Sequence, residues 1–351
     1  MTNASSEEQS TVVGSALHLP VLGRLGGTVL DIVVGGLARL VDVPMRTLQR
    51  LIGERRMAYV FLLPNFAFFS LFVFAPLVIN VVFSVTGGEA LFLSDRPYVG
   101  AGQYRYLFDC GSYLDPASCR EDHFWRGVAN TLRFTAFQLV AMVAFSLTTA
   151  VVLNMRIRAR GFFRAVYFFP VLLSPVVVAL VWKWILQRDG LLNAGLTTLG
   201  GHKILYFVDP GWAMFWSVFV SVWAHMGFYT LILLAGLQAI PADLYEAAQM
   251  DATPRWRVFR RITLPLLWPS LVVVIVLALI RGVQTFDEVF VLTGGGPGTS
   301  TLMIVQYIYE TAFASQVQNF GLAAAASVAL GVVLFVLTLL QLAATRRRSA
   351  S

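Results

Sequence analysis

The chain alternates between long apolar stretches and short polar stretches rich in arginine. Five uncharged apolar stretches are long enough, at about 17 residues or more, to cross a bilayer as a helix, and a sixth tolerates Arg281 near its middle. The stretches are 57–85, 134–155, 165–182, 210–242 and 311–345, with the sixth at 268–292. They are continuous rather than alternating, which indicates helices and not barrel strands. The pattern therefore predicts an all-α, polytopic membrane protein with six transmembrane helices.

The cations are distributed unevenly between the loops of this arrangement. Arginines cluster before the first stretch, after the second, within 255–261 and at the end of the chain, whereas the alternate loops hold fewer cations among acidic residues. Loops rich in arginine and lysine stay on the cytoplasmic side of a membrane. Both termini and the segment 246–265 are therefore predicted to be cytoplasmic.

Composition supports membrane insertion and excludes other classes. Hydrophobic residues make up 57% of the 351 residues and charged residues 13%, against about 25% charged residues in soluble domains. The net charge of +7 does not indicate a nucleic-acid partner, because the arginines lie in separate short loops rather than in one patch. No signal peptide is predicted, since residues 1–16 are polar and partly acidic.

Residues 17–43 place apolar side chains on one helical face and polar ones opposite. No uncharged run there is long enough to span, so we expect an interfacial or cytosolic amphipathic helix, with a seventh span as the alternative. The chain is predicted to divide into a cytoplasmic extension (1–56), a six-span domain (57–345) and a cytoplasmic tail (346–351).

The segment 241–265 is polar and basic although apolar stretches flank it. Pro241 suits the first turn of a helix, which is expected to run to about residue 250. Thr253 and the proline after it indicate the N-cap and first position of a second short helix, ending near Ile262. Two short helices joined by a tight turn would form a knob that projects from the membrane and is shaped for docking.

The spacing of residues in this segment resembles the cytoplasmic loop of permease subunits of binding-protein-dependent ABC importers. In that family the loop reads Glu-Ala-Ala, two residues, Asp-Gly-Ala, eight residues, then Ile-x-Leu-Pro. The resemblance identifies the ATPase-docking residues as Glu246, Ala247, Ala248, Asp251, Ala252, Ile262, Leu264 and Pro265. Ala252 departs from the family glycine, and a side chain costs about 1 kcal/mol in the left-handed conformation that commonly ends a helix. Either Asp251 takes the strained position, or the turn differs from the family's.

Other motifs resemble the carbohydrate-uptake permeases of the maltose and glycerol-phosphate type, and the resemblance covers roughly 57–345. These motifs are Phe162-Phe163-Arg164, Phe169-Pro170, Gly190-Leu191-Leu192-Asn193, and Thr285-Phe286-Asp287-Glu288-Val289 leading into the glycine-rich 294–298. The glycine-rich loop lacks the Gly-Lys-Ser/Thr ending of a phosphate-binding loop. It is expected to form a tight extracytoplasmic turn, and the chain is not expected to bind ATP itself.

The resemblance implies a type I ABC importer architecture and its partners. A dimer of cytoplasmic ABC ATPases would bind ATP, a second permease subunit, a paralogue, would complete the pathway, and a periplasmic binding protein would deliver a mono- or oligosaccharide. Glycerol 3-phosphate or a related polyol phosphate is the alternative solute. The implied location is the bacterial inner membrane, and no catalytic residue, cofactor or metal is expected in this chain.

This chain lacks the residues that two other classes of protein require. A carrier driven by an ion gradient would need carboxylates deep in the spans, whereas Asp287 and Glu288 lie near an outer end. A membrane-bound enzyme would need a nucleophile or metal-ligand arrangement, and the serines, cysteines and histidines form none.

The solute pathway is expected to be lined by polar residues of the spans. Arg281, Gln284 and Glu288 are predicted to share one face of the fifth span, with Asp287 close by. An ionisable residue at membrane depth faces the bundle interior or a wet cavity. One hypothesis is that Arg281 and Gln284 line the solute pathway; the other is a structural contact between Arg281 and a carboxylate. Further polar residues, each expected to satisfy a neighbouring helix, are Asn130, Arg133, Gln138, Lys183 and His225.

Cys110 and Cys119 both fall in the first external loop. A bacterial periplasm permits a disulfide at such a place. A bridge between them is expected, with free thiols as the alternative.

Overall fold

The computed structural model of the chain describes residues 53–349 except 91, 156 and 157, so the helix predicted over 17–43 lies outside the described residues. The chain divides into two compact units, residues 1–77 and 78–351. The described residues form helices joined by loops, with isolated bridges between Thr86 and Tyr98 and between Cys110 and Cys119. The predicted all-helical class is confirmed.

The described part of the first unit is the beginning of one long helix. It consists of α2 (Glu54–Phe69), a π-helical turn (Ser70–Phe74) and the start of α3 (Ala75–Ser84). The π turn lies directly before Pro76, whose ring would press on the carbonyl four residues earlier in a regular α-helix. The segment Phe61–Ser84 is long and apolar enough to cross a membrane.

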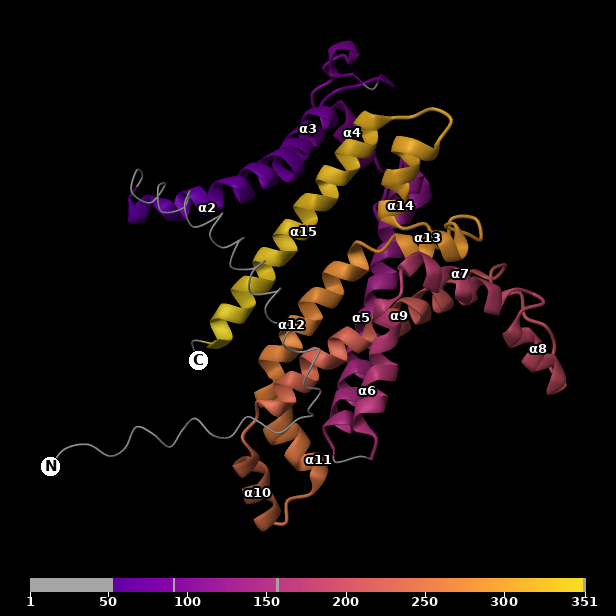
Figure 1. Cartoon of the computed structure of the whole chain (residues 1–351). Coiled ribbons are helices and arrows are strands. Elements are labelled where there is room, and N and C mark those ends of the chain that lie inside the picture. The colour runs from indigo at the N-terminus through magenta and orange to yellow at the C-terminus, as the bar shows by residue number, and fades with distance from the viewer. Residues whose placement is uncertain (1–52, 91, 156–157, 350–351) are drawn as a thin grey trace, which may run out of the picture. The chain divides into compact units, whose positions relative to one another are not determined.

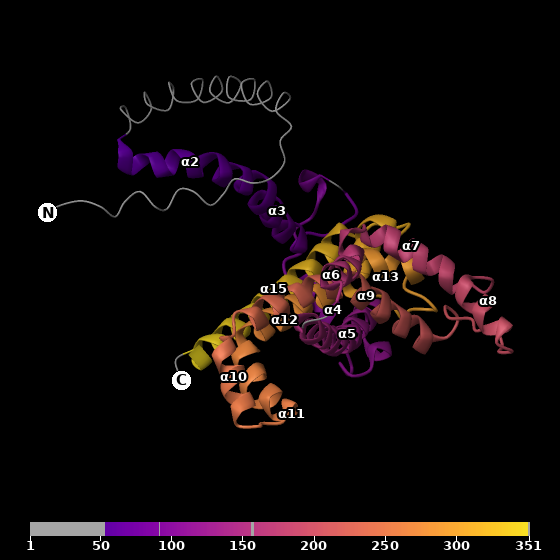
Figure 2. The same ribbon diagram turned by 60° about the horizontal axis from the view of Figure 1, so that its bottom comes forward.

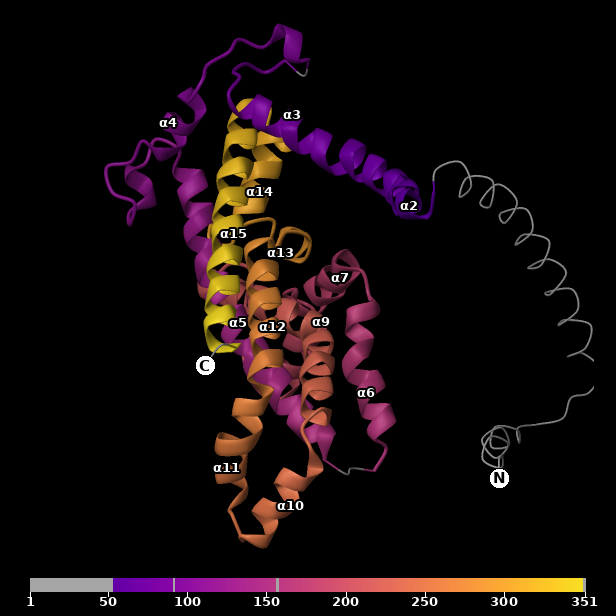
Figure 3. The same ribbon diagram turned by 90° about the vertical axis from the view of Figure 1, so that its left-hand side faces the viewer.

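The second unit is built on three long helices that pack against one another (Figure 1). These are α5 (Asp122–Asn154), α9 (Pro210–Gln238) and α12 (Leu264–Val283). Fully buried apolar side chains from all three, including Met142, Leu233 and Val274, form the main core. The last helix, α15 (Phe320–Ser349), lies beside α12 (Figure 3).

Five segments of the described residues are candidate membrane spans, and a pair of helical segments bent by 100° makes a sixth. The bent pair comprises α6 (Arg160–Phe168) with a 3-10 turn (Phe169–Leu172), then α7 (Pro175–Leu186) and α8 (Leu191–Thr198). The uninterrupted span predicted over 165–182 is therefore wrong. Pro170 lies in the 3-10 turn that ends the first arm at Leu172, and Pro175 occupies the first position of the second arm, where its missing N–H is not needed.

The fifth and sixth spans begin and end at other residues than the sequence predicts. One continuous 29-residue helix is formed by α11 (Arg255–Val258), a π turn (Phe259–Thr263) and α12. The separate short helix ending near Ile262 and the span over 268–292 are thus wrong, because the helix ends at Val283 and α13 (Asp287–Thr293) is separate. The sixth span begins at Phe320, where Asn319 Oδ1 accepts a hydrogen bond from the backbone N–H of Leu322 (3.0 Å) and caps the helix.

Shorter elements complete the second unit. They are α4 (Gly102–Phe108), α10 (Ala242–Met250), α14 (Ile304–Tyr309), a π turn (Glu310–Ala314) and 3-10 turns at Leu93–Asp95 and Pro116–Ser118. The α10 and α11 helices project beyond one end of the bundle, as Figures 2 and 3 show. The bundle therefore presents one exposed helical hairpin at that end.

We expect Gly227→Ala to destabilise the bundle, because α9 crosses the broken span at this glycine. A Cβ at Gly227 would lie 3.0 Å from Phe168 Cα and even closer to the Tyr167 carbonyl oxygen. Such overpacking costs about 1–3 kcal/mol, which thermal unfolding in detergent would measure. Gly195→Ala in α8 is the control, since no heavy atom lies within 4 Å of its Cβ position; equal effects of the two substitutions would contradict the packing argument.

Candidate functional site

The first candidate site is the exposed hairpin formed by α10 and α11. Glu246 and Ala247 of α10 are exposed, whereas Ala248 is buried against the rest of the second unit. Met250, at the tip, is 88% exposed, which is unusual for a large apolar side chain. The hairpin thus offers the Glu246 carboxylate beside small and apolar side chains, with Asp243 and Asp251 also exposed.

The turn after α10 resolves the alternatives left by the sequence. Ala252 adopts the left-handed conformation (φ 50°), while Asp251 keeps φ −78°. The backbone N–H of Thr253 donates to the Ala248 carbonyl (3.0 Å), and that of Ala252 donates to the Gln249 carbonyl (3.0 Å). This is a complete Schellman motif with alanine in place of the usual glycine. The strain expected at Asp251 therefore falls on Ala252 instead.

Ala252→Gly is expected to stabilise this turn. Glycine removes the Cβ penalty of the left-handed conformation but adds freedom to the unfolded chain, so the net gain is about 0.5–1 kcal/mol. A small rise in the unfolding temperature of the purified protein would show it. Ala247→Gly, inside the same helix, should instead lower that temperature; a fall with both substitutions would contradict the Schellman assignment.

One side-chain hydrogen bond fixes α10 to the long helix. The hydroxyl groups of Tyr245 and Thr263 lie 3.2 Å apart and share a hydrogen bond. Thr263 closes the π turn that precedes Pro265, where the wider helix relieves the contact of the proline ring with the preceding turn. Ile262 and Leu264 are half-buried and Pro265 is exposed. The docking residues predicted on both sides of the turn thus belong to one hairpin braced at its base.

The second candidate site is a polar cluster at the other end of the long helix. Arg281 Nη2 lies 3.5 Å from Glu288 Oε2 and 2.9 Å from His225 Nε2. Ser221 Oγ and Thr285 Oγ1 donate hydrogen bonds to Glu288 Oε1 at 3.1 and 3.2 Å. Glu288 is 1% exposed, and the Arg281 side chain is 36% exposed. The carboxylate is therefore compensated inside the bundle while part of the Arg281 side chain stays accessible.

The structure groups these residues differently from the sequence prediction. Arg281 and Glu288 come together across the break between α12 and α13 rather than along one helical face. Gln284, at the end of α12, and Asp287 are exposed, and neither contributes a hydrogen bond to the cluster. Sequence reasoning missed Ser221 and Thr285 and gave His225 no role here, because residues from α9 and the α12–α13 break carry no spacing signal.

Asn130 and Lys183 hold neighbouring segments, as expected, whereas the Gln138 amide forms no hydrogen bond in the described part of the chain. Asn130 Nδ2 donates to the carbonyl oxygens of Thr299 (2.6 Å) and Leu302 (3.2 Å), and Lys183 Nζ donates to the Val291 carbonyl (3.0 Å). Asn130 thereby anchors the loop that contains the glycine-rich residues 294–298. Thr301 closes that loop as a tight turn by donating its Oγ1 hydrogen to the Gly296 carbonyl (2.8 Å).

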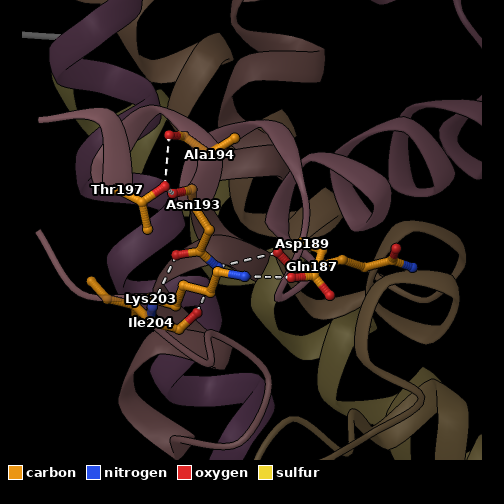
Figure 4. A network of polar contacts seen from close by, with 7 residues as sticks. All are labelled: Gln187, Asp189, Asn193, Ala194, Thr197, Lys203 and Ile204. Atoms are coloured by element: carbon orange, nitrogen blue, oxygen red, sulfur yellow. Dashed lines mark hydrogen bonds and ion pairs between the residues drawn. The ribbon is translucent and has the colours of Figure 1, made fainter.

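A third polar network holds the turn around α8 (Figure 4). The fully buried Asn193 donates through Nδ2 to the carbonyl oxygens of Gln187 (3.2 Å) and Ile204 (2.9 Å), and its Oδ1 accepts from the Ile204 backbone N–H (2.9 Å). Lys203 Nζ and Asp189 Oδ1 form an exposed ion pair (2.6 Å). Every polar atom of the Asn193 amide is used within the turn, which indicates a structural role.

Cys110 and Cys119 are joined by a disulfide that closes a short loop before α5. Among the described residues no group of histidine, cysteine and acidic side chains has the arrangement of a metal site.

Glu121, directly before α5, makes stability dependent on pH. Burial raises the pKa of its carboxyl above the ordinary 4.5. The folded protein therefore keeps the proton where the unfolded chain has lost it, and its stability falls as pH rises from about 4.5 through the folded-state pKa. We expect Glu121→Gln to flatten the unfolding temperature between acid and neutral pH. The exposed control Glu89→Gln should leave the wild-type profile unchanged; equal slopes for Glu121→Gln and wild type would refute the assignment.

Comparison with known proteins gives consistent matches. A family model described as "Binding-protein-dependent transport system inner membrane component" matches residues 142–350. The trehalose/maltose transport system permease protein MalF of Thermococcus litoralis is 32% identical over 298 residues, which cover 84% of this chain and 95% of the relative. The lactose transport system permease protein LacF of Rhizobium radiobacter is 32% identical over 295 residues, 83% of this chain and 94% of the relative.

A solved structure has a similar fold. It is a crystal structure of a bacterial alginate ABC transporter in complex with an alginate pentasaccharide-bound periplasmic protein. The matched chain has a TM-score of 0.71 and 24% identity, over 86% of this chain and 97% of that chain.

Proposed function

Because the chain belongs to the family of inner membrane components of binding-protein-dependent transport systems, we propose that it is the permease of an ATP-driven sugar importer. The observation that carries the proposal is the hairpin of α10 and α11, because a tight turn ties the proposed docking helix α10 to α11, which continues into the membrane-spanning helix without a break. The termini and this hairpin are assigned to the cytoplasmic side, as the arginine-rich loops predict.

The proposed partner of α10 is a cytoplasmic ABC ATPase. Glu246, exposed beside Ala247, supplies a carboxylate for a cation on the ATPase, and the small side chain of Ala247 permits close approach of the two backbones. Met250 adds an exposed apolar contact at the tip. ATP would be bound by the partner, and this chain would supply no catalytic group and no cofactor site of its own.

The proposed transmission runs along the long helix. At 1.5 Å per residue, its 29 residues extend about 43 Å, from the docking turn to the Arg281–Glu288 cluster. A cleft of about 1130 Å³ lies between the inner end of α5 and the hairpin, lined among others by Asn154 and Trp256. The hairpin therefore has room to move with the ATPase while the helix transfers that movement to the break after Val283.

The proposed solute is a mono- or oligosaccharide. The named relatives carry maltose, trehalose or lactose in their names, and the match covers more than four-fifths of this chain. We assign Arg281 to the solute pathway, because its side chain is 36% exposed although Glu288 compensates its charge. A second permease, a paralogue, would supply the other half of the pathway, and a periplasmic binding protein would deliver the sugar.

The proposal is tested by purifying the tagged full-length chain from its native membranes in mild detergent. Mass spectrometry is expected to find an ABC ATPase and a second permease in the same complex. The complex is then reconstituted into proteoliposomes with ATP inside and its binding protein outside, and uptake of labelled maltose, trehalose, lactose and glycerol 3-phosphate is compared.

Uptake of one of the sugars that requires internal ATP would support the proposal. Uptake of glycerol 3-phosphate alone would replace the sugar by a polyol phosphate. Uptake that resists ATP depletion but collapses with an ionophore would identify a gradient-driven carrier and overturn the proposal. Gln284→Ala tests the solute pathway beyond Arg281, and unchanged uptake would leave Gln284 outside it.

A further inference from the structure

A cavity of about 600 Å³ lies at the end of α5 that is remote from the docking hairpin. Three segments enclose it: α5, the disulfide loop at Asp115–Ala117 and the loop at Pro297–Ser300. The other end of α5, at Asn154, lines the cleft beside the hairpin, so the two hollows are separated by most of this 33-residue helix. None of the functional assignments above uses this cavity.

The cavity carries charges of both signs. Arg133 lines it, is exposed, and forms no ion pair or hydrogen bond with any of the described residues. Arg126, two turns away on α5, donates from Nε to Asp122 Oδ2 (3.0 Å), which leaves its terminal nitrogens available. Asp115 lies in the opposite wall, where one carboxylate oxygen accepts from the Ala117 backbone N–H (3.1 Å) and the other has no partner among the described residues.

Arg133 also marks the level at which the apolar surface of α5 begins. It directly precedes Phe134, the first residue of the uncharged stretch 134–155. Phe137 and Val140, four and seven residues further on, continue the same helical face and are 64% and 71% exposed. A ligand in the cavity therefore meets charged groups at one end and an apolar strip at the other.

We propose that this cavity binds a zwitterionic phospholipid, with the phosphate at Arg133 and Arg126 and the headgroup amine at Asp115. A guanidinium recognises phosphate oxygens through several N–H groups in a fixed plane. A phosphoethanolamine headgroup places a cation next to that phosphate, which fits the carboxylate in the opposite wall. The acyl chain lies along Phe137 and Val140, where each buried methylene adds to the affinity.

The Asp115 carboxylate in the cavity also restricts the kind of polar ligand that fits. A purely anionic ligand would leave Asp115 facing a like charge, so a headgroup carrying both charges fits better.

The test measures the lipid retained by the full-length chain together with the subunits that copurify with it. The sample is delipidated, incubated with equal amounts of phosphatidylethanolamine and phosphatidylglycerol, and analysed by native mass spectrometry. The wild type is expected to retain phosphatidylethanolamine. Arg133→Gln should lower this retention roughly ten-fold or more, the size of one lost charge-assisted hydrogen bond, while Arg188→Gln, an exposed arginine outside the cavity, should not change it.

Further arms separate the sources of the ligand and the role of each charge. Asp115→Asn should lower the preference for phosphatidylethanolamine over phosphatidylglycerol by roughly ten-fold while total retention changes little. Soluble glycerophosphoethanolamine at equal concentration should not displace the lipid, because it lacks the chain that lies on Phe137. Arg133→Lys, which keeps the charge, should retain most of the lipid and controls for folding.

Several results would overturn the proposal. One is equal retention by Arg133→Gln and Arg188→Gln. Another is a preference of the wild type for phosphatidylglycerol, and a third is displacement by the soluble headgroup. Efficient cross-linking of Ala129→Cys to a second permease in native membranes would show that protein, not lipid, covers the cavity.

Discussion

Glu246→Arg is expected to abolish ATP-driven uptake by removing the ATPase from the complex. The side chain is exposed on α10, so the substitution disturbs no buried contact of the bundle. We assign the Glu246 carboxylate to a cation of the ATPase. The substitution replaces this carboxylate by a guanidinium, which carries the same sign of charge as that cation. Truncation of one buried partner of such an interfacial pair costs about 2–5 kcal/mol, and reversing the charge adds repulsion, so we expect at least a ten-fold loss of ATPase recovered by pull-down.

The control for this prediction is Glu89→Arg, the same change of charge at an exposed residue far from the hairpin in sequence. It should leave both ATPase recovery and uptake at the wild-type level. Equal unfolding temperatures of the two variants would show that Glu246→Arg acts on docking rather than on folding. Full ATPase recovery with Glu246→Arg would remove Glu246 from the docking surface.

Glu288→Ala is expected to have the largest effect on stability. It leaves Arg281 and His225 without their carboxylate inside the bundle, and it also removes the acceptor for Ser221 and Thr285. Removing one partner of a buried pair costs about 3–5 kcal/mol. Because the Arg281 side chain is 36% exposed, we expect the lower end of this range, a loss of about 3 kcal/mol in the free energy of unfolding, measured by denaturant titration in micelles.

Two variants separate this effect from a general loss of charge. Asp287→Ala changes the neighbouring, exposed carboxylate and should alter the free energy of unfolding by less than about 0.5 kcal/mol. Combining Glu288→Leu with Arg281→Met removes both charges and should recover at least half of the loss, because no uncompensated ion remains. A double variant as unstable as Glu288→Ala would show that the ion pair is not the source of the stability.

The sequence predicted the turn between α10 and α11 better than the spans. The prolines and the family-like spacing placed Glu246 before this turn and Pro265 after it, as the structure has them, and their docking role stays a prediction. The same spacing did not show that Ala252 takes the left-handed conformation or that a π turn before Pro265 makes the hairpin continuous with α12. Both depend on backbone hydrogen bonds, which leave no periodic signal in side-chain chemistry.

The helix breaks inside the apolar stretches could not be predicted from the hydropathy pattern, for a related reason. A bend at Leu173–Ser174 or at 284–286 changes the direction of the chain but not its polarity. Pro170 and Pro175 signalled one bend, since each proline restricts the residue before it. The pair Arg281–Glu288 was named from an i, i+7 spacing, but the two side chains meet across a break between helices, where His225 from α9 joins them.

The bent third span sets an order for insertion of the chain into the membrane during synthesis. Its second helix, α7, has 12 residues and a length of about 18 Å, well short of the roughly 30 Å of a hydrocarbon core. Neither α7 nor α6, which has 9 residues, can therefore cross the bilayer by itself. Gly227 lets α9 pack directly against Tyr167 and Phe168 of the first arm, so this pair acquires its final position after α9 has left the ribosome. A chain that ends before α9 would lack the partner that holds this segment in the membrane.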